Sequence, residues 1–128
     1  MTSLTTKGVN VDIKVDFHTE SDTDGRAGFI FIYHISIRNH NRFPVQLLSR
    51  HWRIFDSNGE VRYVDGEGVV GLQPIIEPDQ IFDYSSFCNL STELGTMSGT
   101  YTLENLHSGN LFEVDIPTFE LATPAIMN

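Results

Sequence analysis

The chain contains a single cysteine, Cys88, and therefore has no pair that could form an internal disulfide. Cations are also scarce: eight Lys and Arg residues stand against seventeen Asp and Glu residues, which gives a formal net charge of −9 at pH 7. Because contact with phosphate backbones and anionic lipids needs a surplus of Lys and Arg, we expect no nucleic-acid partner and no membrane partner.

No apolar run approaches the length of a bilayer-spanning helix, and residues 1–8 lack the hydrophobic core of a signal peptide. Together with the unpaired cysteine, these absences predict a cytoplasmic protein. What is present is a hydrophobic content of 40%, with nine Phe, four Tyr and one Trp. Such a composition supports one domain over residues 1–128, with a core from about 9 to 121.

Alternation of apolar and polar residues dominates the chain, and no segment has a sustained helical stripe. The phase of the alternation slips at Leu47-Leu48, which predicts a β-bulge. We expect a hairpin turn at 56–59 with positive φ at Asn58-Gly59, a loop over 20–28, and an extended tail over 123–128. The predicted strands are 9–17, 29–37, 45–54, 61–63, 75–76, 82–86, 97–103 and 112–116, the last continuing past Pro117 to Leu121.

Seven to eight short strands with regular turns predict an all-β fold, an immunoglobulin or fibronectin type III-like β-sandwich. Two residues favour this class. Tyr101 has the spacing of a tyrosine corner, and Trp52 lies on the third predicted strand, where immunoglobulin domains keep their core tryptophan.

The run 66–71 matches the pattern Gly-x-Gly-x-x-Gly through Gly66, Gly68 and Gly71. In dinucleotide-binding folds this pattern opens a helix, whereas here Pro74 follows closely and Glu67 adds a negative charge. We therefore interpret the run as a strand connector with positive φ values, in which residues 69–70 plug the end of the sandwich. The alternative is a nest of backbone amides that binds an anion.

Arg50, His51 and Arg53 form the densest basic cluster and are the remaining candidate ligand-binding residues. The alternative is a solvated strand face balanced by nearby carboxylates. Residues 22–25, Asp-Thr-Asp-Gly, resemble part of a calcium loop but lack its flanking helices and its distal glutamate. No histidine pair has metal-ligand spacing, no carboxylate pair is fixed across a cleft, and Cys88 has no evident activating partner. We therefore assign no catalytic residue, metal ligand or cofactor, and expect no enzyme activity.

Several segments, in order and spacing, resemble the ApaG family of bacteria over about residues 9–121. They are Ile37-Arg38-Asn39, Pro44 to Trp52, Asn58 to Val61, Gly66 to Gly71, Gln73-Pro74, Gly95-Thr96-Met97 and Ile116-Pro117. The resemblance implies the same β-sandwich and makes the glycine run a family signature. One departure concerns Met97-Ser98-Gly99, which lacks a basic residue often found before that glycine and so loses a possible phosphate contact.

What the resemblance implies about function is a non-catalytic binding module. Similar domains in eukaryotes are attached to an F-box protein and to a DNA-polymerase-interacting protein, which indicates protein–protein interaction with a partner still to be identified. Bacterial members are linked to cobalt and magnesium tolerance and are encoded beside a diadenosine tetraphosphate hydrolase. The alternative is therefore a binder of nucleotide polyphosphate, pyrophosphate, or a divalent cation such as Mg²⁺ or Co²⁺. Exposed edge strands also allow a homodimer.

Overall fold

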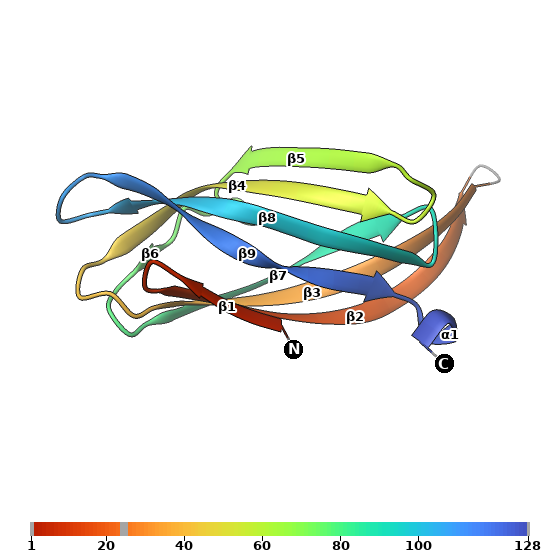
Figure 1. The fold of residues 1–128 in the computed structure, drawn as a ribbon, viewed down its shortest axis with the longest axis horizontal. Coiled ribbons are helices and arrows are strands. Elements are labelled where there is room, and N and C mark those ends of the chain that lie inside the picture. Colours follow the sequence, from red (N-terminus) through yellow and green to blue (C-terminus); the bar gives the residue numbers. More distant parts are fainter. Residues whose placement is uncertain (1, 24–25, 128) are drawn as a thin grey trace.

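The computed structural model describes residues 2–23 and 26–127, with the backbone alone for 22, 23, 26, 27 and 127. Two antiparallel sheets pack face to face into an elongated sandwich (Figure 1). The fold is an all-β, immunoglobulin and fibronectin type III-like sandwich, as predicted. Among the described residues, no helix is long and apolar enough to cross a membrane.

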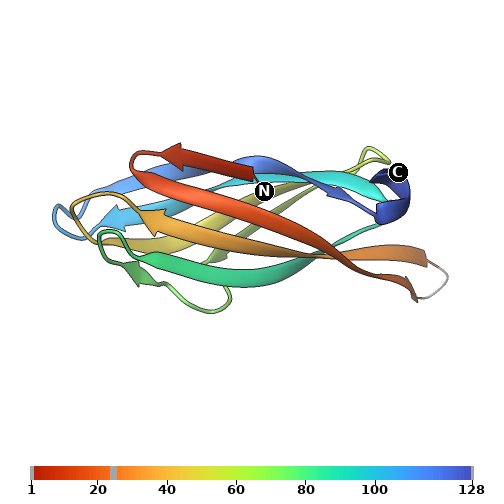
Figure 2. The same ribbon diagram turned by 90° about the horizontal axis from the view of Figure 1, so that it is seen from below.

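The first sheet has the order β1-β2-β3-β7, which Figure 2 shows from its outer side. Its strands are β1 (Thr2–Thr6), β2 (Val9–Thr23), β3 (Arg26–Asn39) and β7 (Ile81–Leu90). The second sheet has the order β5-β4-β8-β9, with a short β6 paired to β4. Its strands are β4 (Val45–Asp56), β5 (Val61–Glu67), β6 (Ile75–Ile76), β8 (Leu94–Asn105) and β9 (Leu111–Ala122).

Two predictions about connections were wrong. The expected loop over 20–28 is largely strand, because β2 continues to Thr23 and β3 resumes at Arg26, so that this hairpin extends beyond the sandwich (Figure 1). Strand pairing in such an arm satisfies the backbone without an apolar side-chain pattern. In the suggested calcium loop, Asp24 and Gly25, and the side chains of 22 and 23, lie outside the described residues.

The C-terminal tail was also predicted wrongly, since Pro124–Met127 form the helical turn α1 instead of an extended segment. Proline is favoured at the first position of a helix, where its missing N–H is not needed. The turn is closed by the amide of Ile126, which donates to the carbonyl of Thr123 at 3.1 Å.

The β-bulge predicted near Leu47-Leu48 is confirmed, because the register of β4 against β8 shifts between Leu47 and Ser49. As a result, Leu47 and Trp52 are both buried. The strand continuing past Pro117 is confirmed as well. There the register shifts again, and Pro117-Thr118 of β9 lie opposite the single residue Ser98. A bulge accommodates a proline, which cannot donate to the ladder.

The hairpin turn between β4 and β5 is confirmed, although its geometry differs from the prediction. Positive φ occurs at Gly59, with a value of 95°, and not at Asn58. The amide of Gly59 donates to the carbonyl of Asp56 at 2.9 Å. The connection is therefore longer than a two-residue Asn-Gly turn, with glycine in the left-handed position at its end.

Trp52 lies in the core, as predicted, with its ring in contact with those of Tyr33, Tyr101 and Phe119. The tyrosine-corner prediction was wrong. The buried hydroxyl of Tyr101 shares a hydrogen bond with the hydroxyl of Tyr84, which comes from β7 in the opposite sheet. Tyr101 therefore links the two sheets and does not tie down a neighbouring stretch of backbone.

Candidate functional site

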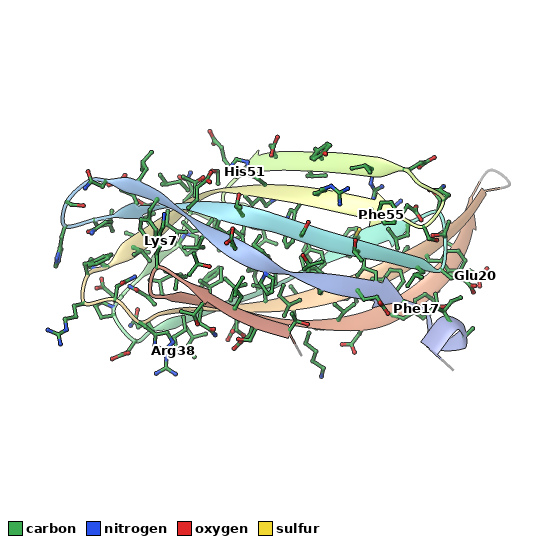
Figure 3. All side chains as sticks on the ribbon, viewed as in Figure 1. Lys7, Phe17, Glu20, Arg38, His51 and Phe55 are labelled. Carbon is green, nitrogen blue, oxygen red and sulfur yellow. The ribbon has the colours of Figure 1, made fainter. Side chains whose placement is uncertain are left out.

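The basic cluster predicted from the sequence is divided between the two faces of the second sheet. Successive residues of a strand point to opposite faces, so Arg50 shares the inward direction of Trp52, while His51 and Arg53 point outward. His51 is labelled in Figure 3. On the outer face His51 Nδ1 lies 2.9 Å from a carboxylate oxygen of Asp65. Arg53 is exposed on the same face. His51 and Arg53 thus occupy a solvated strand face, and Arg50 belongs to a different surface.

Arg50 is held against the glycine run. It pairs across the strands with Gly66, and a Cβ added to Gly66 would stand 2.8 Å from Arg50 Nη1. The same Nη1 donates to the carbonyl oxygens of Glu67 at 3.1 Å and Gly68 at 2.8 Å. Gly66 is therefore required because the guanidinium passes directly over its backbone.

The amides of the glycine run are largely engaged with backbone carbonyls. Gly68 N donates to Leu48 O at 2.7 Å, and Val69 and Leu72 exchange amide–carbonyl hydrogen bonds of 2.8 and 2.9 Å. Between Val69 and Leu72, φ is 43° at Val70 and 79° at Gly71, as in a type I′ turn. The run is thus a strand connector, as predicted, and the amides of Gly68, Val69 and Leu72 are not available to an anion.

We predicted that residues 69–70 would both be buried at the end of the sandwich, and this is confirmed for Val69 only. Val69 is fully buried, whereas Val70 is 54% exposed. The reason is the turn itself, which reverses the chain at Val70 and places its side chain outside.

The two sides of the sandwich differ. On one side β1 lies against β9 and closes the space between the sheets (Figure 2). On the other side the edge strands β5 and β7 do not pair, and a cleft of about 300 Å³ lies between them. The cleft is lined by Tyr33, Arg50, Trp52, Ile54, Arg62, Val64, Ser86, Phe87, Cys88, Asn89 and Met97.

This lining contains two arginines and no acidic residue. The side chain of Arg62 reaches from β5 across the opening to β7, where its Nη2 donates to the carbonyl of Asn89 at 2.6 Å. Trp52 is 3% exposed, and its indole Nε1 has no hydrogen-bond partner among the described residues. An unsatisfied buried donor costs about 1–3 kcal/mol, so an acceptor brought to it would be stabilised.

Burial also shapes the titration of the groups around this cleft. It raises the pKa values of Tyr33, Tyr84 and Tyr101, and the nearby Arg50 guanidinium opposes this rise. Burial likewise raises the pKa of the Cys88 thiol, against the attraction of Arg62. A thiol with a raised pKa carries less thiolate at neutral pH and is a weaker nucleophile.

Arg62 and the β7 residues of the cleft were missed from the sequence. A signal was present, because Arg62, Val64 and Gly66 share one phase of the alternation in β5. That phase faces inward only because Gly66 pairs with Arg50 and Val64 with Trp52. The contribution of β7 had no local signal, since it depends on which edges of the two sheets face each other.

A Ser–His–Asp contact chain crosses the outer face of the first sheet. His34 Nδ1 lies 2.7 Å from Ser85 Oγ, and His34 Nε2 lies 3.1 Å from Asp16 Oδ2. The side chains of His34 and Asp16 are 43% and 56% exposed, and Ser85 lies within a regular strand instead of a strained turn beside oxyanion donors. We interpret these Ser85–His34–Asp16 contacts as cross-strand interactions that stabilise the first sheet.

No metal centre is formed by the described part of the chain, where no three His, Cys, Asp or Glu residues are grouped so as to hold an ion. The open cleft between β5 and β7 is therefore the principal candidate site. Fold and cleft together define the class: an immunoglobulin-like sandwich with one open, cationic side.

Within this class, the chain belongs to the ApaG domain family, whose family model matches residues 19–105. It is 41% identical over 128 residues to a protein ApaG of Anaeromyxobacter dehalogenans, covering 100% of both chains. It is 42% identical over 119 residues to protein ApaG of Methylorubrum populi, covering 93% of this chain and 91% of the relative.

Solved structures agree with the fold. The crystal structure of a putative ApaA protein from Bordetella pertussis is 39% identical and superimposes with a TM-score of 0.83, covering 91% of this chain and 94% of that one. The X-ray structure of a structural-genomics target is 35% identical and has a TM-score of 0.89, with 93% and 89% coverage.

Proposed function

We propose that this protein is a non-catalytic binding module that docks a protein partner on the open side of the sandwich, between β5 and β7. The observation that carries the proposal is that β5 is an exposed edge strand with an uncovered edge. It is an edge strand of seven residues, six of which are exposed, and its free edge has no strand beside it among the described residues. Natural edge strands are normally covered or blunted, and an uncovered edge is a template for strand addition.

Exposed apolar side chains flank that edge. Tyr63 is 71% exposed and Phe87, on β7, is 72% exposed, while Val61 and Val64 are each 39% exposed. Aromatic residues are enriched at protein–protein interfaces because they supply large contact areas at low entropic cost. Tyr63 pairs with Arg53 and therefore points to the outer face of the second sheet, on the strand that borders the open side. The exposed apolar residues of the two edge strands support the open side as the docking surface.

The test is site-specific photo-crosslinking in the native cells. A photoreactive phenylalanine analogue replaces Tyr63 or Phe87, and the control carries it at Leu111, the first residue of β9, which is 61% exposed. We expect one discrete adduct from positions 63 and 87 and none from 111. The same adduct yield at all three positions, or adducts from 111 alone, would refute the docking surface.

The alternative is a binder of nucleotide polyphosphate or a divalent cation. The two cleft arginines support the polyphosphate, because guanidinium groups attract anions, and they give no support to a divalent cation. Calorimetry with ATP, diadenosine tetraphosphate, Mg²⁺ and Co²⁺ separates the two functions. Submillimolar binding that is lost in Arg62→Gln would favour the small-ligand function over protein docking.

A further inference from the structure

The charge of the cleft is opposite to that of the chain. The protein carries a net charge of −9, yet the cleft is lined by Arg50 and Arg62 and by no Asp or Glu. Among the described side chains the ion pairs are His34–Asp16 and His51–Asp65, so neither cleft arginine has a carboxylate partner. Two guanidinium groups without carboxylate partners favour an anionic ligand.

The two arginines stand at opposite ends of the cleft. Along the paired strands, Arg50 lies opposite Gly66 and Arg62 lies opposite Ile54. Since residues in a strand advance by about 3.4 Å each, these positions are separated by about 14 Å. Between them the inward residues are Trp52 and Val64, so the centre of the cleft is apolar.

The inward residues of β5 are Arg62, Val64 and Gly66, and the guanidinium of Arg50, from β4, lies over Gly66. Along β5 the cleft therefore presents a cation, an apolar residue and a second cation. A strand added to the free edge of β5 would place its own alternate side chains against these groups. Charge and register complementarity then require an acidic residue at both ends of a five-residue stretch and an apolar residue in the middle.

We propose that the cleft recognises an extended segment of a partner protein with the pattern acidic–x–apolar–x–acidic, paired to the edge of β5. This inference rests on the proposed docking function and specifies the chemistry of the partner. Arg62 and Arg50 bind the two carboxylates. Val64, Tyr33 and Trp52, which line the cleft between them, contact the apolar residue.

The experiment titrates the full chain with two blocked peptides that lack aromatic residues. One is Thr-Glu-Thr-Leu-Thr-Glu-Thr, and in the other both glutamates are glutamine. Trp52, the single tryptophan, lies in the cleft, so its fluorescence reports binding directly. Backbone amide NMR shifts show whether β5 is the strand contacted. Sodium acetate at matched carboxylate concentration serves as the free-anion probe.

We expect the glutamate peptide to bind at least about tenfold more tightly than the glutamine peptide, with the difference reduced by salt. Arg62→Gln should remove this difference. Arg62 is an exposed residue, so the variant is expected to fold. Arg53→Gln, a change of the same kind on the outer face, should preserve the difference.

Equal affinity for the two peptides, or no response to either up to millimolar concentration, overturns the inference. A response to acetate as large as that to the peptide also overturns it, because the site would then be a simple anion site. If the peptides fail while photo-crosslinking at position 63 still gives its adduct, protein docking stands and only the acidic pattern is wrong. If both fail, docking on this side is wrong too.

Discussion

The three signature glycines should respond very differently to alanine, because each is required for a different reason. At Gly71, φ is 79° and a Cβ would meet no atom within 4 Å, so only the left-handed backbone is strained. At Gly68, φ is 62° and a Cβ would also lie 2.1 Å from the carbonyl oxygen of Leu72. At Gly66 the obstacle is the Arg50 guanidinium, the mobile end of a long side chain.

The expected losses of unfolding free energy follow from these contacts. Left-handed backbone costs alanine about 1–2 kcal/mol, partly offset by a less flexible unfolded chain, so Gly71→Ala should lose about 1 kcal/mol. Gly68→Ala adds a clash with backbone, worth about 1–3 kcal/mol more. The Leu72 carbonyl cannot move freely, since it accepts from Val69 N at 2.8 Å. Gly66→Ala displaces Arg50 from two carbonyls, at a cost of about 1–2 kcal/mol.

Urea denaturation followed by Trp52 fluorescence measures all three values. A double-mutant cycle adds the decisive control: in an Arg50→Ala background, Gly66→Ala should become nearly neutral, while Gly68→Ala keeps its full cost. Equal costs at Gly68 and Gly71, or a cost at Gly66 that persists without Arg50, would refute this account of the signature.

Three further results are expected. Val70→Asn should raise the free energy of unfolding by about 1 kcal/mol, because asparagine tolerates the left-handed φ of 43° better than a β-branched residue; unchanged urea midpoints would contradict this. The contribution of Tyr33, Tyr84 and Tyr101 to stability should be constant below about pH 10 and fall above it. Burial raises their pKa values in the folded state, so the unfolded chain ionises first. The slope is at most about 1.4 kcal/mol per pH unit for each tyrosine, and urea curves at pH 8 and 11 that coincide would exclude it. Cys88, buried and with a raised pKa, should react with a thiol reagent at pH 8 only as fast as the protein opens, and rapidly in urea; fast labelling of the native protein would show the thiol to be accessible.

Much of the fold could be predicted because its signals are local. The alternation at 9–17 and 29–37 marked two long strands, and the slip at Leu47-Leu48 marked a bulge that β4 contains. In two places where the apolar–polar alternation did not predict a strand, backbone pairing forms one. Near residue 20, polar residues of β2 and β3 form strands because their backbones pair with each other. β1 is likewise a strand because its backbone pairs with β2.

The candidate site was predicted only in part, because adjacency in sequence does not give adjacency on a strand face. Arg50 was selected as part of the basic cluster, and its hydrogen bonds to the carbonyls of Glu67 and Gly68 place it against the glycine run. His51 and Arg53, selected with it, lie on the opposite face. Arg62 entered the site without having been selected, through the pairing of β5 with β4.

The sequence by itself determined the sandwich class, its family and the presence of a core tryptophan, because alternation and turn residues act over a few positions. Only the tertiary structure decided that Gly66 makes room for a guanidinium, that Tyr101 bonds to Tyr84 across the sheets, and that the sandwich opens between β5 and β7. These features arise from how two sheets pack against each other, and side chains far apart in the chain meet only once that packing is formed.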